Sequence, residues 1–151
     1  MQDLSLHILD LVDNCLRAEA TRVTVEIRED RAGDKLYIDI VDNGRGMDRP
    51  TRERVLDPFF TTKAAKTVGL GLPLFAQAAR ESGGSLRLDS APGRGTAVHA
   101  VFGLSHPDRR PLGDVEGTIQ MLQAAHPEIE LVYNHTTSGE EVAHETETRR
   151  S

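Results

Sequence analysis

The sequence predicts an α+β fold, in which a β-sheet has helices beside it, in one domain with a small C-terminal appendage. Two observations lead to this prediction. Apolar residues recur at helical spacing near the N-terminus, and two pairs of alternating segments are each joined by a turn. At 151 residues, 38% of them hydrophobic, the chain is long enough to bury a core.

The first element is an amphipathic helix over residues 4–18. Its apolar positions are Leu4, Ile8, Leu11, Val12, Cys15 and Leu16. At ~100° per residue, His7, Asp10, Asn14 and Arg17 fall within roughly 80° of one another on another side. This stripe is either a solvated helix face or, given the motifs described below, the wall of a site.

Strands follow the helix. Residues 22–28 and 36–41 alternate apolar and polar positions and predict a hairpin across a polar turn. Pro73 suits the first turn of a helix that runs to about residue 82, where Gly83 and Gly84 end it. Residues 85–90 and 96–102 flank the turn sequence APGRG and predict a second hairpin.

The C-terminal part carries weaker signals. Residues 106–113 contain two prolines and predict a connector, and Val115, Ile119 and Leu122 indicate a short helix. Residues 130–135 and 140–147 are plausible strands, and the last residues should fray. We therefore expect a main domain over residues 1–105 and an extension over residues 106–151.

Composition restricts the partners. A net charge of −6 argues against binding to a nucleic-acid backbone, and no apolar run approaches the ~20 residues that cross a membrane. The single cysteine, Cys15, cannot form an internal disulfide, and the N-terminus lacks signal-peptide features. We expect a soluble, cytoplasmic protein that binds neither nucleic acid nor membrane.

Four motifs in order predict an ATP site: DLVDNCLR at residues 10–17, DNGRGM at 42–47, DPFFTTK at 57–63 and VGLGLPL at 68–74. In the first motif, Asp10 and Asn14 lie one helical turn apart. Asn14 could supply an oxygen ligand to Mg²⁺, and Asp10 could orient or deprotonate a water. Arg17 could face phosphate oxygens. Alternatively, Asp10 is a surface acid with local contacts.

In the second motif, Asn43-Gly44 alone would suggest a hairpin turn, but Asp48-Arg49-Pro50 follows instead of a strand. Gly44 and Gly46 would let the backbone approach a flat ligand, and Asp42 could accept a hydrogen bond from the exocyclic amine of adenine.

The remaining two motifs predict a lid and a phosphate-binding turn. Residues 61–67 contain two lysines and three threonines, and they lead into Gly69-Leu70-Gly71 at the start of a helix. Such a turn presents backbone N–H groups to an anion. The G-x-x-x-x-G-K-[ST] pattern of P-loop enzymes does not occur.

Together, residues 4–103 resemble the family that unites gyrase, Hsp90, histidine kinases and mismatch-repair ATPases (GHKL). Asn14 matches the N box, and Asp42, Gly44 and Gly46 match the first glycine box. Phe59 and Phe60 match the F box, Gly69 and Gly71 the second glycine box, and Gly93, Gly95 and Thr96 the later G-x-G-T segment. The resemblance implies a two-layer α/β sandwich of the Bergerat type, with a mixed, mainly antiparallel sheet covered by helices. It also implies ATP and Mg²⁺ as cofactors, with Mg²⁺ held by Asn14. The implied nucleotide-binding residues are Asn14, Arg17, Asp42, Gly44, Gly46, Met47, Phe60, Thr62, Lys63, Gly69, Leu70, Gly71, Leu72 and Thr96.

Within this family, residues 57–74 and 83–102 are most similar to histidine-kinase catalytic domains. Residues 10–27 look more like the mismatch-repair ATPases, in which an acid one turn before the asparagine is the general base. Asp10 occupies that position and is shorter than the usual glutamate. Thr67 stands where the kinase pattern commonly has glycine.

Only a few residues precede the first helix, so we expect any phosphoacceptor to lie on another polypeptide. The resemblance then implies a stand-alone kinase or slow ATPase that acts with a separate protein partner in signalling or regulation. A serine kinase of the anti-sigma type is one variant, and a homodimer is compatible with the resemblance. A nucleotide-sensing module without chemistry is the alternative.

Overall fold

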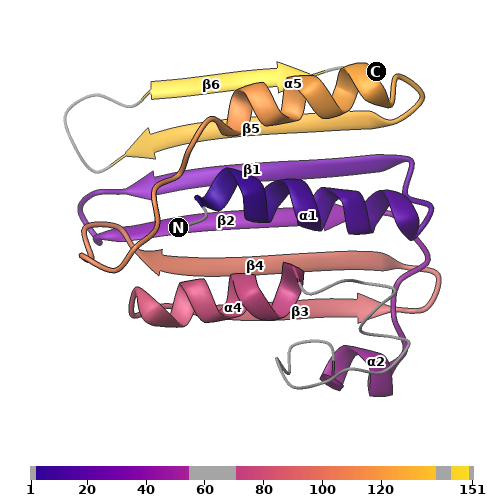
Figure 1. The fold of residues 1–151 in the computed structure, drawn as a ribbon, viewed down its shortest axis with the longest axis horizontal. Coiled ribbons are helices and arrows are strands. Elements are labelled where there is room, and N and C mark those ends of the chain that lie inside the picture. The colour runs from indigo at the N-terminus through magenta and orange to yellow at the C-terminus, as the bar shows by residue number, and fades with distance from the viewer. Residues whose placement is uncertain (1–2, 55–70, 139–143, 150–151) are drawn as a thin grey trace.

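A computed structural model describes residues 3–54, 71–138 and 144–149 of the chain. Its elements follow the order α1 (Leu4–Arg17), β1 (Arg22–Asp30), β2 (Lys35–Asp42), α2 (Arg49–Arg54), α4 (Gly71–Glu81), β3 (Ser85–Ala91), β4 (Gly95–Gly103), α5 (Val115–Ala125), β5 (Glu130–Ser138) and β6 (His144–Arg149). The six strands form one sheet in the order β3-β4-β2-β1-β5-β6. Helices α1, α4 and α5 lie side by side on one face of that sheet (Figure 1). The predicted two-layer α+β fold is confirmed.

The two predicted hairpins are present. β1 pairs antiparallel with β2, with Ile27 opposite Ile38, and β3 pairs antiparallel with β4, with Leu88 opposite Val98. β2 and β4 lie next to each other, which joins the hairpins into one sheet. The strands β1, β2 and β4 direct alternate apolar side chains under the helices, because successive strand residues point to opposite faces.

The C-terminal residues continue this same sheet. β5 lies parallel to β1, with Tyr133 opposite Val25, and β6 pairs antiparallel with β5. Both expected terminal strands are present, the second described over residues 144–149, so residues 146–149 pair in a strand where fraying was expected. The sequence did not predict that these strands would join the edge of the main sheet. The division of the chain at residue 105 stays a prediction.

The connector and α5 also hold the first helix. The N–H groups of Leu4 and Ser5 donate to the carbonyls of Pro111 and Leu112 at 2.8 and 2.9 Å, and α5 packs against α1. Asp3 caps the helix by accepting a hydrogen bond from the N–H of Leu6. Residues outside the resemblance thus help to place α1.

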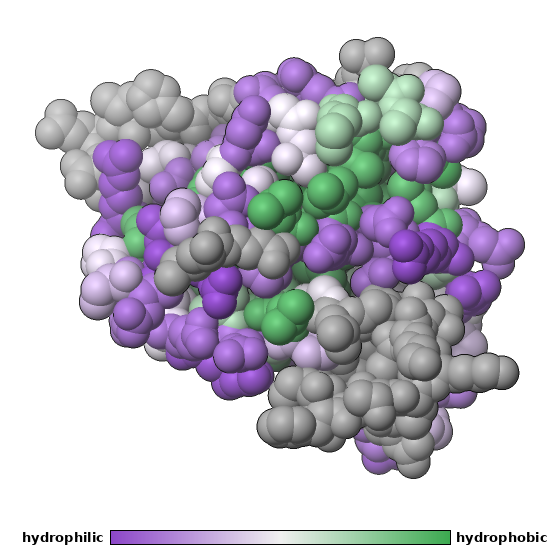
Figure 2. All heavy atoms as spheres, viewed as in Figure 1, coloured by the Kyte–Doolittle hydropathy of each residue, from purple (hydrophilic) through white to green (hydrophobic). Residues whose placement is uncertain are grey.

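The core lies between the sheet and the three helices. Its largest fully buried side chains include Phe75 of α4, Phe102 of β4 and Ile8 of α1. Figure 2 views the helix-covered face, where apolar residues gather near the middle and hydrophilic residues surround them. In the described part of the chain, no helix has the length and apolar character needed to span a membrane.

Candidate functional site

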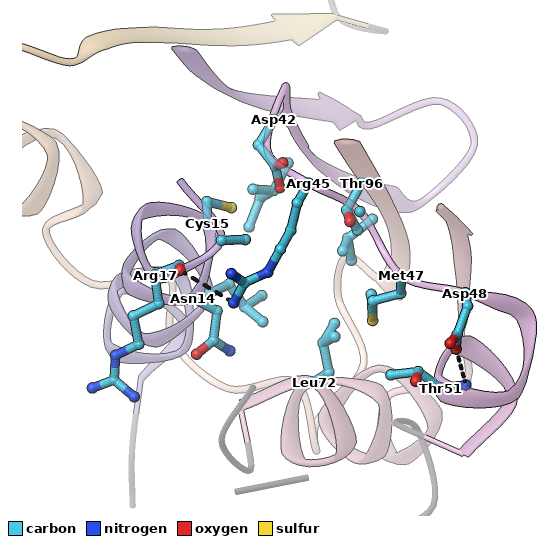
Figure 3. A pocket seen from close by; sticks show the side chains of 15 residues that line it. Asn14, Cys15, Arg17, Asp42, Arg45, Met47, Asp48, Thr51, Leu72 and Thr96 are labelled. Carbon is cyan, nitrogen blue, oxygen red and sulfur yellow. Dashed lines mark hydrogen bonds between the residues drawn. The ribbon is translucent and has the colours of Figure 1, made fainter. Parts of the chain in front are cut away.

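A cavity of about 300 Å³ opens between α1, the C-terminal end of β2 and the start of α4 (Figure 3). Apolar and polar side chains share its wall, which is typical of a small-molecule site. The residues that line it are Leu11, Asn14, Cys15, Arg17, Ala18, Ile40, Asp42, Arg45, Gly46, Met47, Asp48, Thr51, Leu72, Thr96 and Val98.

Asp42 forms one end of this cavity at the last residue of β2. Its side chain is buried, and Oδ1 accepts a hydrogen bond from the N–H of Gly44 at 2.7 Å. Burial raises the pKa of the neighbouring Cys15 thiol well above its usual range, and the negative charge of Asp42 raises that pKa further. The Gly44 hydrogen bond fixes the carboxylate, so Asp42 is a pre-oriented acceptor.

The loop after β2 is fastened at several points. Asn43 Oδ1 accepts hydrogen bonds from the N–H groups of Thr21 and Arg22 at 2.9 and 3.0 Å. Asn43-Gly44 therefore does not form a hairpin turn but ties the loop to the start of β1. Met47 N–H donates to Ser90 Oγ at 2.8 Å, which fastens the loop to β3.

The two glycines of this loop are required by the packing of the protein itself. Gly46 has φ +73°, and a Cβ there would collide with the Ala91 carbonyl oxygen. A Cβ at Gly44 would lie 2.7 Å from the Ala18 carbonyl oxygen. Close approach of a flat ligand to these glycines stays a prediction, since their internal contacts already explain them.

Asn14 faces the cavity from α1. Its Nδ2 is buried, and no described residue provides it with a hydrogen-bond partner. A Cβ at Gly71 would lie 3.7 Å from this atom and 3.3 Å from Asp10 Cβ, so α1 and the start of α4 are close here. A buried N–H₂ group that lacks a partner among the described residues can donate to a ligand, and the oxygen of the same side chain is the kind of hard ligand that Mg²⁺ takes.

The structure brings many of the predicted site residues together. Asn14, Arg17, Asp42, Gly46, Met47, Leu72 and Thr96 line the cavity, and Gly44 and Gly71 contact residues that line it. Phe60, Thr62, Lys63, Gly69 and Leu70, together with Phe59, lie outside the described residues.

The polar stripe of α1 does not form a single wall. Asn14 and Arg17 line the cavity, whereas Asp10 is exposed and is not among the described lining residues. His7 is buried with 2% of its surface exposed, and its ring lies 5.9 Å from that of Phe75. The interpretation of this stripe as a solvated face is wrong at His7, because α4 covers that side of the helix.

Sequence reasoning also missed part of the wall. Cys15 follows Asn14 in the first motif, and Arg45 stands between Gly44 and Gly46 in the second. Their positions in the motifs could therefore have indicated that they line the cavity. Ile40, Thr51 and Val98 carried no comparable signal, because their place depends on how β2, α2 and β4 meet.

A buried carboxylate fixed at one end of a cavity, with an amide N–H₂ group that lacks a partner among the described residues near a helix start, suits a nucleotide-binding domain, since adenine offers an amine and phosphates offer acceptor oxygens. A sequence model of the family described as "Histidine kinase-, DNA gyrase B-, and HSP90-like ATPase" matches residues 2–106. The chain belongs to that family and is an ATP-binding, histidine-kinase-like domain.

Similar proteins include sensor kinases. The chain is 36% identical over 88 residues to the nitrogen regulation protein NtrY of Azorhizobium caulinodans, with 58% of this chain and 11% of that protein covered. It is 39% identical over 97 residues to the sensor protein kinase FleS of Pseudomonas aeruginosa, with 64% and 24% covered. It is 37% identical over 96 residues to the signal transduction histidine-protein kinase AtoS of Escherichia coli, with 63% and 16% covered. The chain thus spans less than a quarter of the length of each of these relatives.

The fold also matches a crystal structure of the N-terminal domain of a DNA repair protein, with a TM-score of 0.63 and 16% identity. The match covers 99% of this chain and 54% of that one, so it includes the strands beyond residue 106. At this identity the likeness concerns the fold alone.

Proposed function

We propose that this protein binds Mg²⁺–ATP in the cavity between α1 and β2 and acts, in the cytoplasm, as a kinase or slow ATPase toward a separate protein partner in signalling or regulation. The supporting observation is that Asp42 is fixed at one end of the cavity while the buried Nδ2 of Asn14 lacks a partner among the described residues. The likeness to sensor kinases supports a signalling role.

The division of roles follows from the chemistry of the side chains. The carboxylate of Asp42 accepts the hydrogen bond of the adenine amine, and Ile40, Met47 and Val98 supply apolar surface for the base. The oxygen of Asn14 binds Mg²⁺, which offsets the charge of the phosphates.

Isothermal titration calorimetry with ATP, in the presence and absence of Mg²⁺, tests the binding step. Asp42→Ala should abolish detectable binding, and Asn14→Ala should weaken it mainly when Mg²⁺ is present. Asp39→Ala is the matched control, because Asp39 stands on the same strand but on the uncovered face, where it contacts His99 at 2.7 Å. A wild-type protein without nucleotide affinity would refute the proposal.

The chemical step needs a separate experiment. The protein, purified with its native interactors, is given γ-labelled ATP and Mg²⁺, and the label is followed to protein or to free phosphate. Transfer to a partner histidine or serine supports a kinase, with serine favouring the anti-sigma type, and release of phosphate supports an ATPase.

One observation favours a second candidate, a nucleotide-sensing module without chemistry. Asp10, the candidate general base, is exposed and is not among the described residues that line the cavity. ATP binding without hydrolysis or transfer, even with partners present, supports this alternative. An Asp10→Asn variant with unchanged turnover would separately remove Asp10 from the catalytic role.

A further inference from the structure

Arg45 places a second cation at the cavity, between the two glycines of the loop after β2. Its backbone is fastened on both sides. The N–H of Arg45 donates to the Ala18 carbonyl at 2.9 Å, and its carbonyl accepts from the N–H of Gly93 at 2.7 Å. The side chain therefore starts from a fixed point and extends along the cavity toward Asn14 (Figure 3).

Within the described part of the chain, the guanidinium of Arg45 makes two long contacts. Nη2 lies 3.4 Å from the Arg17 carbonyl oxygen, and Nη1 lies 3.5 Å from Glu19 Oε1. Both distances are at the outer limit for a hydrogen bond, and the side chains of Arg45 and Glu19 are 55% and 78% exposed. Exposed pairs of this kind contribute little, so a ligand can replace these contacts at small cost.

Arg17, the cation that the sequence motif suggested, has a different environment. Its Nη2 lies 3.0 Å from Asp13 Oδ2, one helical turn earlier on α1. In Figure 3 its guanidinium points away from the cavity, whereas that of Arg45 lies near Asn14. Among the described residues that line the cavity, Arg17 and Arg45 are the two cations, and Arg45 is the one that reaches inward.

We propose that Arg45 binds phosphate oxygens of the nucleotide. Asp42 and Asp48 place two carboxylates on the cavity wall, and a triphosphate brings further negative charge. A guanidinium beside Asn14 would offset this charge where the metal and phosphates gather, and its planar fork matches phosphate oxygens. This inference rests on the binding of ATP in this cavity, as proposed above.

Calorimetry with ATP, ADP and adenosine, each without Mg²⁺, tests the assignment in wild-type protein, Arg45→Gln and Arg45→Lys. In Arg45→Gln the Kd for ATP and ADP should rise about tenfold, as expected for loss of a charge-assisted hydrogen bond, while the Kd for adenosine should change less than twofold. Arg45→Lys should be intermediate, because lysine keeps the charge but not the fork. Arg87→Gln is the matched control, since Arg87 pairs with Asp89 on the uncovered face of the sheet.

Three results would contradict the assignment of Arg45 to the phosphates. Equal weakening for adenosine and ATP would overturn the assignment, because it would place Arg45 on the base or sugar. Unchanged ATP affinity in Arg45→Gln would overturn it as well, and so would a loss of the same size in Arg87→Gln. If wild-type protein binds adenosine and ATP, and Arg45→Gln binds both with the same Kd values, the role of Arg45 is refuted but the proposed binding of ATP is not. If wild-type protein binds no nucleotide, the proposed function fails with it.

Discussion

Replacing His7 with leucine should stabilise the protein, and the gain should grow as the pH falls. Both ring nitrogens of His7 are buried, and no described residue offers either of them a hydrogen bond. A buried polar group without a partner costs about 1–3 kcal/mol, whereas the ring contact with Phe75 is worth about 0.5–1.5 kcal/mol. Leucine removes both the cost of the buried nitrogens and the ring contact, so we expect the free energy of unfolding to rise by about 1 kcal/mol at pH 8.

The pH dependence follows from the direction of the pKa shift. Burial lowers the pKa of His7, the charge of Arg110 lowers it further, and Asp10 and Asp3 oppose them. Below the pKa of about 6.5 that a histidine has in the unfolded chain, the unfolded state takes up a proton that the folded state refuses. Above that pH, His7 is neutral in both states, and its protonation does not affect the free energy of unfolding. As the pH falls toward the folded pKa, the free energy of unfolding of wild-type protein decreases, with a slope of at most about 1.4 kcal/mol per pH unit.

Urea unfolding at pH 8, 7, 6 and 5 measures both effects for wild-type protein, His7→Leu and His7→Phe. The phenylalanine variant keeps an aromatic ring against Phe75 but has no ring nitrogens, so it separates the polar cost from the ring contact. His126→Leu is the control, because the side chain of His126 is 39% exposed and such changes stay within about 0.5 kcal/mol. The reasoning is refuted if both His7 variants are less stable than wild type at pH 8, or if their difference from wild type does not widen toward pH 5.

Three further predictions concern the fold and the site. Cys15 should react slowly with a thiol reagent at pH 8, and Asp42→Asn should speed the reaction, because the charge of Asp42 adds to burial in raising the thiol pKa. Equal rates would contradict this cause. Gly46→Ala should cost more than about 2 kcal/mol in urea unfolding, since φ +73° disfavours alanine and its Cβ would strike the Ala91 carbonyl. A variant within 0.5 kcal/mol of wild type would mean that the loop shifts easily, on the scale of ordinary surface substitutions. Finally, truncation after residue 105 should leave a chain without a cooperative unfolding transition, because it removes buried residues of α5 and β5 worth on the order of 10 kcal/mol, comparable with a whole domain's stability. A cooperative melt of the truncated chain, followed by circular dichroism, would show that the main domain folds alone.

Local patterns predicted most of the fold. The helix α1 and the two hairpins depend on periods of 3.6 and 2 residues and on nearby turn residues, all of which lie within short stretches of sequence. The parallel pairing of β5 with β1 could not be predicted in this way. It joins Val25 to Tyr133 across most of the chain, and no turn sets the register of such a pair.

The site shows the same division. That Asp42 and Asn14 would line one cavity could be predicted, because their motifs specify residue type and spacing together. The burial of His7 and the direction of Arg45 could not, because each depends on a neighbour that is distant in sequence. For His7 that neighbour is α4, and for Arg45 it is the end of α1, whose Ala18 carbonyl fixes the start of the side chain.

The C-terminal extension bears on the candidate site through α1. This helix carries Asn14 and Cys15 on the cavity wall, while its first turn is hydrogen-bonded to the carbonyls of Pro111 and Leu112 and one side packs against α5. Those contacts lie beyond residue 106, where the match to the family ends. Because a helix moves largely as a rigid unit, a change in how α5 packs would displace Asn14 relative to Asp42, which is fixed to the sheet. Substitutions in α5 that alter its contact with α1 should therefore change nucleotide affinity although they lie outside the cavity.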